Sequence, residues 1–201
     1  MRVEVEYFPG PGPENTEEVL RIAKKRADEL GIKNIVVAST TGETGMKAVQ
    51  LLKGHQVVVV THSTGFREPN FQSLTEENRA KIIAGGGLIY TAQHAFGGFN
   101  RAVRRQFNTY QLDEIVAYVL RTFGNGMKVA IEISMMAADG GLIRTNEDVI
   151  SIGGSGGGAD TAIVFKPVNA QNFFDLRVRE ILCKPRTFEL RGSWRLGQEV
   201  T

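Results

Sequence analysis

The sequence NIVVASTTGETG, residues 34–45, contains a short apolar run followed by hydroxyl side chains and glycines. The run from Ile35 to Ala38 has no polar residue, which is typical of a strand buried on both faces of a parallel sheet. A helix is expected from about Glu43 to Leu52, so the intervening loop joins the carboxyl end of a strand to a helix start. This order predicts an α/β fold.

Strand and helix patterns alternate along the rest of the chain in the same way. The clearest helix begins after Asn15, which together with Glu18 predicts a capping box, and it ends at Gly31. Residues 2–7 alternate charged and apolar side chains, as a half-exposed strand does. The other patterns predict helices at 75–84, around 101–105 and at 112–123, and strands at 57–60, 88–90, 127–136, 149–152, 162–165 and, at one edge, 173–183.

The composition is that of an ordered protein, with 42% hydrophobic and 23% charged residues among 201. We expect a single domain over 1–201, with a core at about 15–185 and a polar tail after Pro185. A net charge of +2 gives no reason to expect nucleic acid or a membrane surface as a partner. The sequence shows no signal peptide, no apolar run of membrane-spanning length and a single cysteine, so a cytoplasmic location is expected. The 23 glycines need a reason other than low complexity.

The loop after the first buried strand is the first candidate site. Free N–H groups at a helix start and the helix dipole attract anions, hydroxyl groups add donors, and glycine allows the backbone to approach closely. No Gly-Lys-Ser/Thr follows, so the loop is not a Walker A motif. An equally open alternative is a capped loop without a ligand, because Ser and Thr are favoured caps. The candidate phosphate-binding residues are Ser39, Thr40, Thr41, Gly42, Thr44 and Gly45.

A dense glycine run, GGSGGGAD at 153–160, is the second candidate site. Part of it fits the dinucleotide pattern G-x-G-x-x-G/A, but a strand-like segment follows where that pattern needs a helix. We interpret the run as backbone that contacts a flat ligand, because so many glycines cost conformational entropy on folding. The alternative is a flexible connection between two strands. The candidate residues are Gly153, Gly154, Ser155, Gly156, Asp160 and Thr161.

The segment after the second buried strand, with Thr61, His62 and Gly65, is the third candidate site. Ligands in an open α/β sheet lie outside the carboxyl ends of adjacent strands, so this segment is expected beside the 39–45 loop. His62 would bond a phosphate or tune a ring, but a histidine bonded to nearby backbone is at least as good an interpretation. His94 is a weaker candidate of the same kind.

Other reactive side chains receive mostly structural interpretations. Asp139 would end a strand and lie in the same crevice, or it would form a turn with the glycine that follows. Glu132 would be either exposed or paired within a strand. Cys183 is expected to pack rather than to react, and the arginines at 101–105 to lie on a solvated helix face. The sequence contains no recognised metal-binding or nucleophile motif.

The segment from Asn15 through the 39–45 loop resembles the C-terminal α/β domain of pyruvate kinase. The chain is more similar still to the small stand-alone proteins of archaea and bacteria that are named for that domain. This resemblance spans about residues 15–185 and is carried by NIVVAS at 34–39, VVVVTH at 57–62, MAADGGLI at 136–143, GGGADTA at 156–162 and NFFDL at 172–176.

The resemblance implies a three-layer α/β/α sandwich with a mainly parallel sheet and, from family members of known structure, a bound flavin mononucleotide (FMN). In the pyruvate kinase domain, a Ser/Thr/Gly loop of this kind holds a phosphate of the allosteric sugar bisphosphate. The length leaves no room for the barrel of a pyruvate kinase, so we do not expect kinase activity.

The leading hypothesis is therefore an FMN-binding protein, in which the flavin would carry any redox chemistry, as in a flavin-dependent oxidoreductase. Whether it is an enzyme stays open, and no catalytic residue is assigned. The alternative is a non-catalytic sensor of a phosphorylated metabolite, either a sugar phosphate or a nucleotide. An apolar stripe on the predicted helix 111–123 and an edge strand near 176–183 are compatible with a homo-oligomer.

Overall fold

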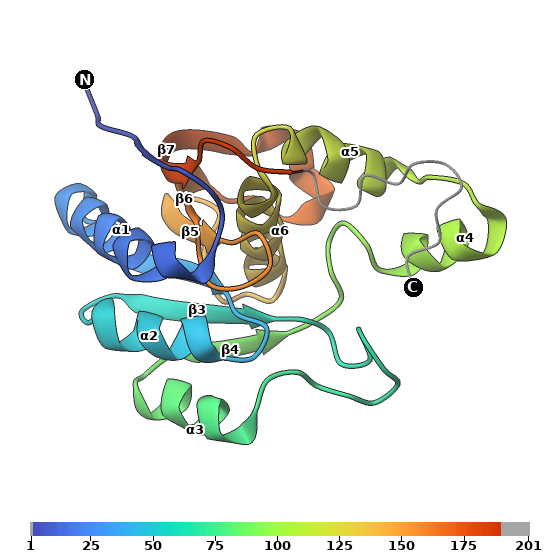
Figure 1. Cartoon of the computed structure of the whole chain (residues 1–201), viewed down its shortest axis with the longest axis horizontal. Coiled ribbons are helices and arrows are strands. Elements are labelled where there is room, and N and C mark those ends of the chain that lie inside the picture. Colours follow the sequence, from blue (N-terminus) through green and yellow to red (C-terminus); the bar gives the residue numbers. More distant parts are fainter. Residues whose placement is uncertain (1, 190–201) are drawn as a thin grey trace.

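A seven-stranded sheet runs through the computed structural model, which describes residues 2–189 (Figure 1). The strand order is β1-β7-β6-β5-β2-β3-β4. Neighbouring strands are parallel except at β6, which is antiparallel to both β5 and β7. The strands are β1 (Glu6–Phe8), β2 (Asn34–Ala38), β3 (Gln56–Thr61), β4 (Leu88–Thr91), β5 (Val149–Gly153), β6 (Thr161–Lys166) and β7 (Arg177–Pro185).

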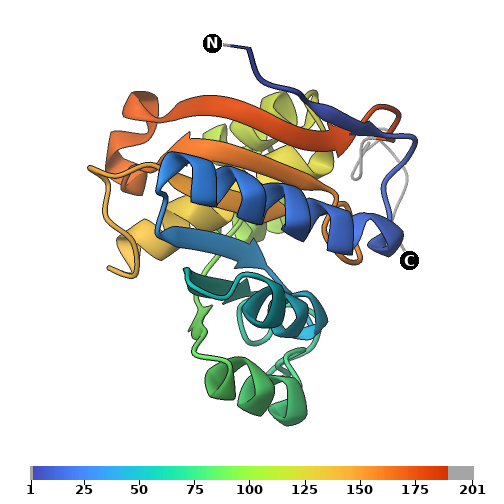
Figure 2. The ribbon, with the colours of Figure 1, turned by 90° about the vertical axis from the view of Figure 1, so that its left-hand side faces the viewer.

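Helices cover both faces of this sheet, as Figures 1 and 2 show. One face carries α1 (Thr16–Leu30), α2 (Glu43–Leu51) and α3 (Glu76–Ala84). The other face carries α6 (Asn125–Asp139), on which α5 (Leu112–Arg121) packs, and α4 (Phe99–Phe107) lies further out. Two 3₁₀ helices, Pro13–Asn15 and Ala170–Asp175, complete the described elements.

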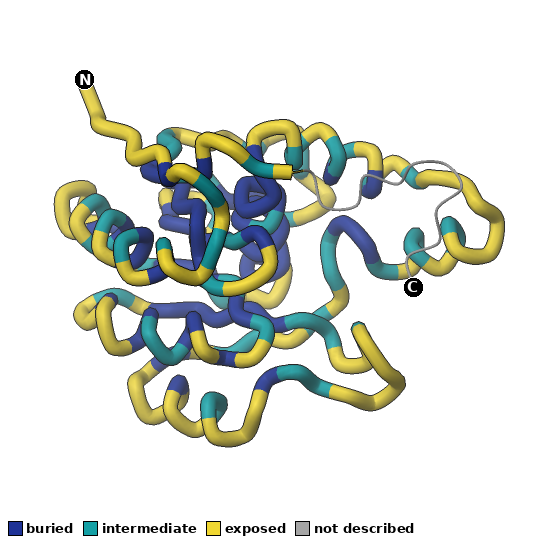
Figure 3. The backbone as a smooth tube through the Cα atoms, in the orientation of Figure 1, coloured by how far each residue is buried: buried dark blue, intermediate teal, exposed yellow. Residues whose placement is uncertain are grey.

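Alternate residues of β2 explain why helices are needed on both sides. Ile35 and Val37 pack into the core under α1, α2 and α3, while Val36 packs into the core under α6. All three side chains are fully buried, and Figure 3 shows burial concentrated in the sheet and α6. The predicted α/β/α sandwich with a mainly parallel sheet is confirmed.

Helix α1 ends as predicted but begins differently. Gly31 adopts a left-handed conformation, φ 67°, that closes the helix. The predicted capping box is wrong, because Asn15 has helical backbone angles from the preceding 3₁₀ turn and its side chain donates to the carbonyl of Gly10 at 2.9 Å.

The largest error in the predicted elements is at residues 127–136, which belong to helix α6 rather than to a strand. Thirteen of the fifteen residues of α6 are buried, because the helix lies between the sheet and α5. A helix that is buried all round has no polar face, so its sequence lacks the helical period that would identify it.

The C-terminal strand lies at the edge of the sheet over most of its length, as its sequence predicts. Strand β7 pairs with β6 over residues 177–183, whereas β1 pairs with its other side only at residues 183–185. The edge-strand prediction is therefore confirmed over residues 177–182 and wrong at 173–175, where residues 170–175 form a 3₁₀ helix. Strand β1 begins at Glu6, opposite Cys183, and pairs with β7 over only three residues, so the strand predicted at residues 2–7 is confirmed only in its last two residues. Residues 2–5 of the predicted first strand lie outside it. Most of the predicted polar tail, residues 190–201, lies outside the described residues.

Candidate functional site

The chain leaves the sheet in opposite directions at the boundary between β2 and β5. Helix α2 leads from β2 to β3, the neighbour of β2 on one side, whereas the loop after β5 leads to β6, the neighbour of β5 on the other side. Val37 of β2 pairs with Ile152 of β5, so the loops that follow the two strands begin side by side. Such a switch point at the carboxyl ends of parallel strands is where open α/β sheets bind ligands. The predicted 39–45 and 153–160 loops therefore both lie at this edge.

Several residues of the 39–45 loop are required by the fold itself. The Ser39 hydroxyl accepts the Gly45 amide at 3.0 Å and so caps the first turn of α2. Gly42 has a φ of 95°, and a Cβ there would lie 2.5 Å from Leu74 Cδ1. A Cβ on Gly45 would lie 2.7 Å from Val59 Cγ1, because α2 packs closely on β3. These three residues shape the loop, whether or not a ligand binds.

The threonines of this loop are the side chains left to face a ligand. The Thr40 hydroxyl is half-buried and lies 3.4 Å from Nε2 of His62. Thr41 is exposed, and its carbonyl holds the Asn78 side chain at 3.0 Å. Thr44 is buried in the first turn of α2. The contact between Thr40 and His62 confirms that the loops after β2 and β3 are neighbours.

The glycine-rich loop is braced by the carboxylate of Asp160, which is fully buried. This carboxylate accepts the Ser155 amide at 2.9 Å and the Thr161 hydroxyl at 2.7 Å. Gly158 has a φ of 63°, and a Cβ there would lie 2.5 Å from Pro13 Cα, so the loop packs against the start of α1. Gly156 is exposed with a φ of 119°. The loop therefore has a fixed shape rather than that of a loose connection.

Gly153 and Gly154 have separate packing requirements. A Cβ on Gly153 would lie 2.3 Å from the carbonyl oxygen of Gly126, which places the N-terminus of α6 at the same sheet edge. A Cβ on Gly154 would lie 2.2 Å from the carbonyl oxygen of Gly158. Both glycines are thus needed where two backbone segments meet.

Three rings gather beyond the ends of β3 and β4. The rings of His62 and His94 have centroids 5.2 Å apart, and Phe66 lies 4.2 Å from His62 and stacks on His94 at 4.9 Å. The Thr61 and Thr91 hydroxyls are hydrogen-bonded at 2.6 Å and hold the two strand ends together. Gly65 has a φ of 80° in the turn that carries Phe66. His94, a weaker candidate in the sequence, thus lies beside His62.

A buried ion pair supports this ring cluster from α6. Lys128 Nζ lies 2.5 Å from Glu132, and the two side chains are only 8% and 4% exposed. Glu132 also accepts the Phe96 amide at 3.0 Å and lies 3.7 Å from Nδ1 of His94. Of the two interpretations of Glu132, the paired one is confirmed, on a helix rather than a strand. Lys128 was missed, although a Lys and a Glu four residues apart in an apolar run could have indicated a helical ion pair.

Two ionisation states follow from this packing. Burial, together with the charges of His94 and Arg67, lowers the pKa of His62 to about 4, so His62 is neutral at pH 7. Burial alone would raise the pKa of Glu132, but Lys128 and His94 outweigh it and hold this pKa below its ordinary value.

Burial also raises the pKa of Cys183 to about 12, which supports a packing role for this thiol.

The remaining sequence candidates lie elsewhere. Asp139 ends α6, whose fifteen residues span about 22 Å from the N-terminus beside Gly153, so it does not share the crevice. Its carboxylate instead accepts the amide of Ala170 at 3.2 Å. The arginines at 101–105 are not all solvated, because Arg101 lies 4.9 Å from the Phe66 ring centroid. Within residues 2–189, no group of three His, Cys, Asp or Glu side chains is placed to hold a metal ion.

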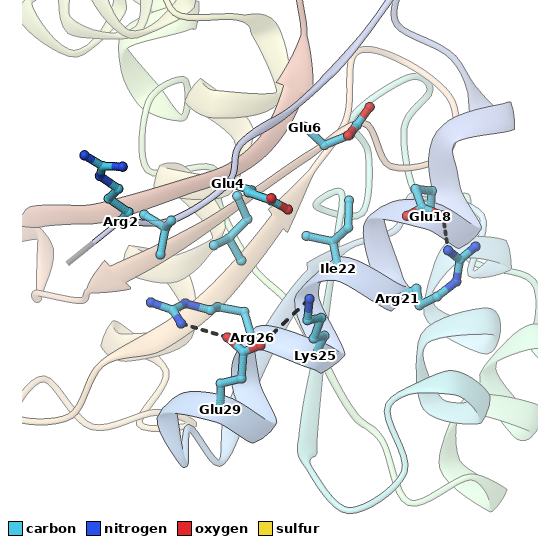
Figure 4. Close-up of a pocket in the computed structure, with 11 residues that line it drawn as sticks. Arg2, Glu4, Glu6, Glu18, Arg21, Ile22, Lys25, Arg26 and Glu29 are labelled. Carbon is cyan, nitrogen blue, oxygen red and sulfur yellow. Dashed lines mark hydrogen bonds and ion pairs between the residues drawn. The ribbon is translucent and has the colours of Figure 1, made fainter.

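A separate cavity of about 700 Å³ lies between the N-terminal segment and α1 (Figure 4). Its side chains carry both charges, and many form ion pairs, such as Arg26 with Glu29 and Glu180 at 2.8 and 2.7 Å. None of the predicted site residues lines it, and no sequence motif indicated it. The lining residues are Arg2, Val3, Glu4, Glu6, Glu18, Arg21, Ile22, Lys25, Arg26, Glu29 and Leu182.

A mostly parallel sheet between two helical layers, with polar loops at the carboxyl ends of its strands, defines an α/β/α domain. The family model described as "Pyruvate kinase, alpha/beta domain" matches residues 17–165. The chain belongs to this family. No helix among residues 2–189 has both the length and the apolar character needed to cross a membrane.

Similar solved structures include two of Cryptosporidium parvum pyruvate kinase. The first is 13% identical with a TM-score of 0.34, over 69% of this chain and 20% of that chain. The second, in complex with ADP, is 15% identical with a TM-score of 0.36, over 77% of this chain and 23% of that chain. A mutant O-ureido-L-serine synthase bound to O-ureido-L-serine is 16% identical with a TM-score of 0.30, over 67% of this chain and 49% of that chain. The chain thus spans 20% to 23% of the pyruvate kinase chains.

Proposed function

We propose that the chain binds a phosphorylated ligand at the β2–β5 switch point and that this ligand is FMN. The observation that carries the proposal is a set of buried polar atoms without a hydrogen-bond partner among the described residues. Three of the four such atoms, Ser155 Oγ, His62 Nδ1 and His94 Nε2, belong to the loops after β5, β3 and β4. An unsatisfied buried polar atom costs about 1–3 kcal/mol, so the concentration of such atoms at one edge of the sheet favours a ligand-binding site there.

The phosphate of the ligand would lie at the start of α2. The helix dipole favours an anion at this position, and the Thr40 and Thr41 hydroxyls would donate to its oxygens. Ser39 would act indirectly, because its hydroxyl already accepts the Gly45 amide. Thr40 also links the phosphate position to His62.

FMN is favoured over other phosphate esters by the family resemblance together with the polar atoms beyond the phosphate position. A flavin ring carries hydrogen-bonding groups along one edge, which Ser155 Oγ and the neighbouring backbone could meet. When bound, FMN supplies two-electron redox chemistry, and this chain would hold and orient it. An oxidoreductase activity is part of this proposal, with no substrate assigned.

Replacing Thr40 with valine is expected to weaken FMN binding at least about tenfold, because a hydrogen bond to a charged phosphate contributes roughly 1.5–3 kcal/mol. Flavin fluorescence is measured while the purified protein is titrated into FMN. The matched control is Thr145→Val, because Thr145 is also half-buried but lies in the turn before β5, at the other end of that strand. This control should bind FMN like the wild type.

Two outcomes would contradict the proposal. One is no change in flavin fluorescence at micromolar FMN. The other is equal affinity of the Thr40→Val and Thr145→Val variants. Stabilisation by a sugar bisphosphate or a nucleotide but not by FMN, measured as a shift in Tm, would favour the metabolite sensor instead.

We also propose that the chain forms a homo-oligomer through the outer face of α5. Leu112 is 74% exposed, Val119 is 58% exposed, and the nearby Phe107 is 69% exposed, so an apolar surface lies open on this side. Apolar surface gathered in one place is typical of an interaction site. The proposed partner is a second copy of the chain.

Light scattering after size exclusion is expected to give a mass of at least twice 22.1 kDa for the wild type. The Leu112→Glu/Val119→Glu variant should elute as a monomer, because charges on this face oppose its burial. Ile83→Glu is the control, since Ile83 is 58% exposed on α3. A monomeric wild type, or a double variant with unchanged mass, would refute the assignment.

A further inference from the structure

The ring cluster beyond β3 and β4 has an excess of positive charge. Arg101 is half-buried and its guanidinium lies over the Phe66 ring, 4.9 Å from the centroid. Arg67 is close enough to act on the pKa of His62. The carboxylate that acts on His62 is Glu132, which Lys128 already neutralises.

Neither arginine has a carboxylate partner in the part of the chain that the structure describes. The ion pairs of residues 2–189 include Arg104 with Glu114 and Lys128 with Glu132, but none that involves Arg67 or Arg101. Burial lowers the pKa of Arg101, as expected for a guanidinium that lacks an anion to stabilise it. A half-buried cation without a counter-charge is costly, and an anionic ligand would offset that cost.

Each of the two neighbouring histidine rings, whose centroids lie 5.2 Å apart, keeps one ring nitrogen unengaged. Nδ1 of His62 and Nε2 of His94 are buried and have no hydrogen-bond partner among residues 2–189. The other nitrogen of each ring is engaged, since Nε2 of His62 faces Thr40 and Nδ1 of His94 faces Glu132. The two rings are therefore oriented by the protein, each with one nitrogen left over.

We propose that His62, His94 and Arg101 form a binding site for a small oxyanion, either a phosphate group or the carboxylate of an organic acid. The guanidinium would supply charge and paired N–H donors, and a protonated imidazole would supply a further donor. The Phe66 ring contacts all three groups and supplies an apolar surface beside them. This site follows β3 and β4, whereas the proposed FMN phosphate lies at the start of α2. The two proposals share the unsatisfied nitrogens of His62 and His94, but only the oxyanion site requires Arg101.

Binding at this site is expected to take up a proton. An anion favours the charged imidazolium, so it should raise the pKa of His62 from about 4. The charged groups that act on His62 are Arg67 on its own loop, His94 after β4, Arg101 on α4 and Glu132 on α6. Because the anion stabilises the protonated ring, its affinity should rise as the pH falls toward about 4.

The experiment titrates inorganic phosphate, lactate and propionate separately into the flavin-free protein and follows the histidine ring signals by NMR. The expected result is saturable movement of the His62 and His94 signals, with the pKa of His62 raised. If phosphate binds most tightly, the ligand is a phosphate ester. If lactate binds most tightly, the ligand is an organic acid whose hydroxyl group adds a hydrogen bond. Propionate has the carboxylate but no hydroxyl group, so its affinity shows how much the carboxylate alone contributes.

Arg101→Gln should weaken the tightest probe at least about tenfold, the effect of losing a charge-assisted hydrogen bond. Arg105→Gln is the matched control, because Arg105 is exposed on the same helix, and its effect should stay within about twofold. Equal affinities of these two variants, or histidine signals that none of the three anions moves, would overturn the proposal. FMN titration of Arg101→Gln shows independently whether the phosphate site at α2 is present.

Discussion

Glu132→Gln is expected to lower the free energy of unfolding by about 3–5 kcal/mol, because the Lys128 ammonium would then be buried without a counter-charge. Lys128 is only 8% exposed, so water cannot replace the lost carboxylate. The side-chain amide that replaces the carboxylate keeps an oxygen for the Phe96 N–H, which confines the loss to the charge. Urea denaturation of wild type and variant gives the difference.

Two further variants show whether burial is the cause. Glu77→Gln breaks an exposed pair with Lys81 at the same spacing of four residues, and its cost should be far smaller, because water screens both charges. The Lys128→Met/Glu132→Leu double variant removes both buried charges and should recover most of the stability that Glu132→Gln loses. Equal effects of Glu77→Gln and Glu132→Gln would show that the Lys128–Glu132 pair is not buried in solution.

The dependence of the free energy of unfolding on acid pH gives an independent test of the Lys128–Glu132 pair. The pKa of Glu132 is 4.5 in the unfolded chain and lower in the folded protein, so its contribution is present above pH 4.5 and is lost as the pH falls toward about 2. The pKa of His62 is also lower in the folded protein, from 6.5 to about 4, so its contribution is lost over a higher pH range. Glu132→Gln should therefore flatten the stability profile below pH 4.5 and leave the higher range largely unchanged.

The Lys128–Glu132 pair also shows where the sequence stops being informative. Strands β2 and β3 were predictable because each is a continuous apolar run of strand length, and parallel strands between helices bury both faces. Helix α6 is equally apolar for a different reason, since it is buried by the sheet and by α5 together. Composition alone cannot separate these two environments, which is why the pattern at 127–136 indicates a strand where the fold has a helix.

The candidate site likewise has a part that the sequence predicts and a part that depends on how the helices pack. The approach of Thr40 to His62 was predictable, because neighbouring parallel strands bring their following loops to one edge. Glu132 and Arg101 reach the rings from α6 and α4, and the position of these helices depends on packing that no local pattern records. The Asp160 carboxylate and the glycines around it were predicted to face a ligand, yet their visible contacts are within the protein.

Gly153→Ala is expected to lower the free energy of unfolding by at least about 2 kcal/mol, because the added methyl group meets backbone rather than a movable side chain. The new Cβ would lie 2.3 Å from the Gly126 carbonyl oxygen and 2.9 Å from the Ala130 amide nitrogen. Relief requires α6 to move away from β5, which would disturb the core on that face. Urea denaturation of the ligand-free protein measures the effect without any contribution from FMN.

Gly157→Ala in the same loop is the matched control, because a Cβ there has no atom within 4 Å and its φ is not in the left-handed region. This substitution should be neutral or stabilise the protein by up to about 1 kcal/mol, since it restricts the unfolded chain. A large loss for Gly153→Ala with none for Gly157→Ala would show that packing of α6 on β5 requires glycine at 153, so this glycine cannot by itself count as a sign of a flat ligand. If Gly153→Ala were as stable as the wild type, that packing would be looser in solution, and ligand contact would again be the better reason for the glycine.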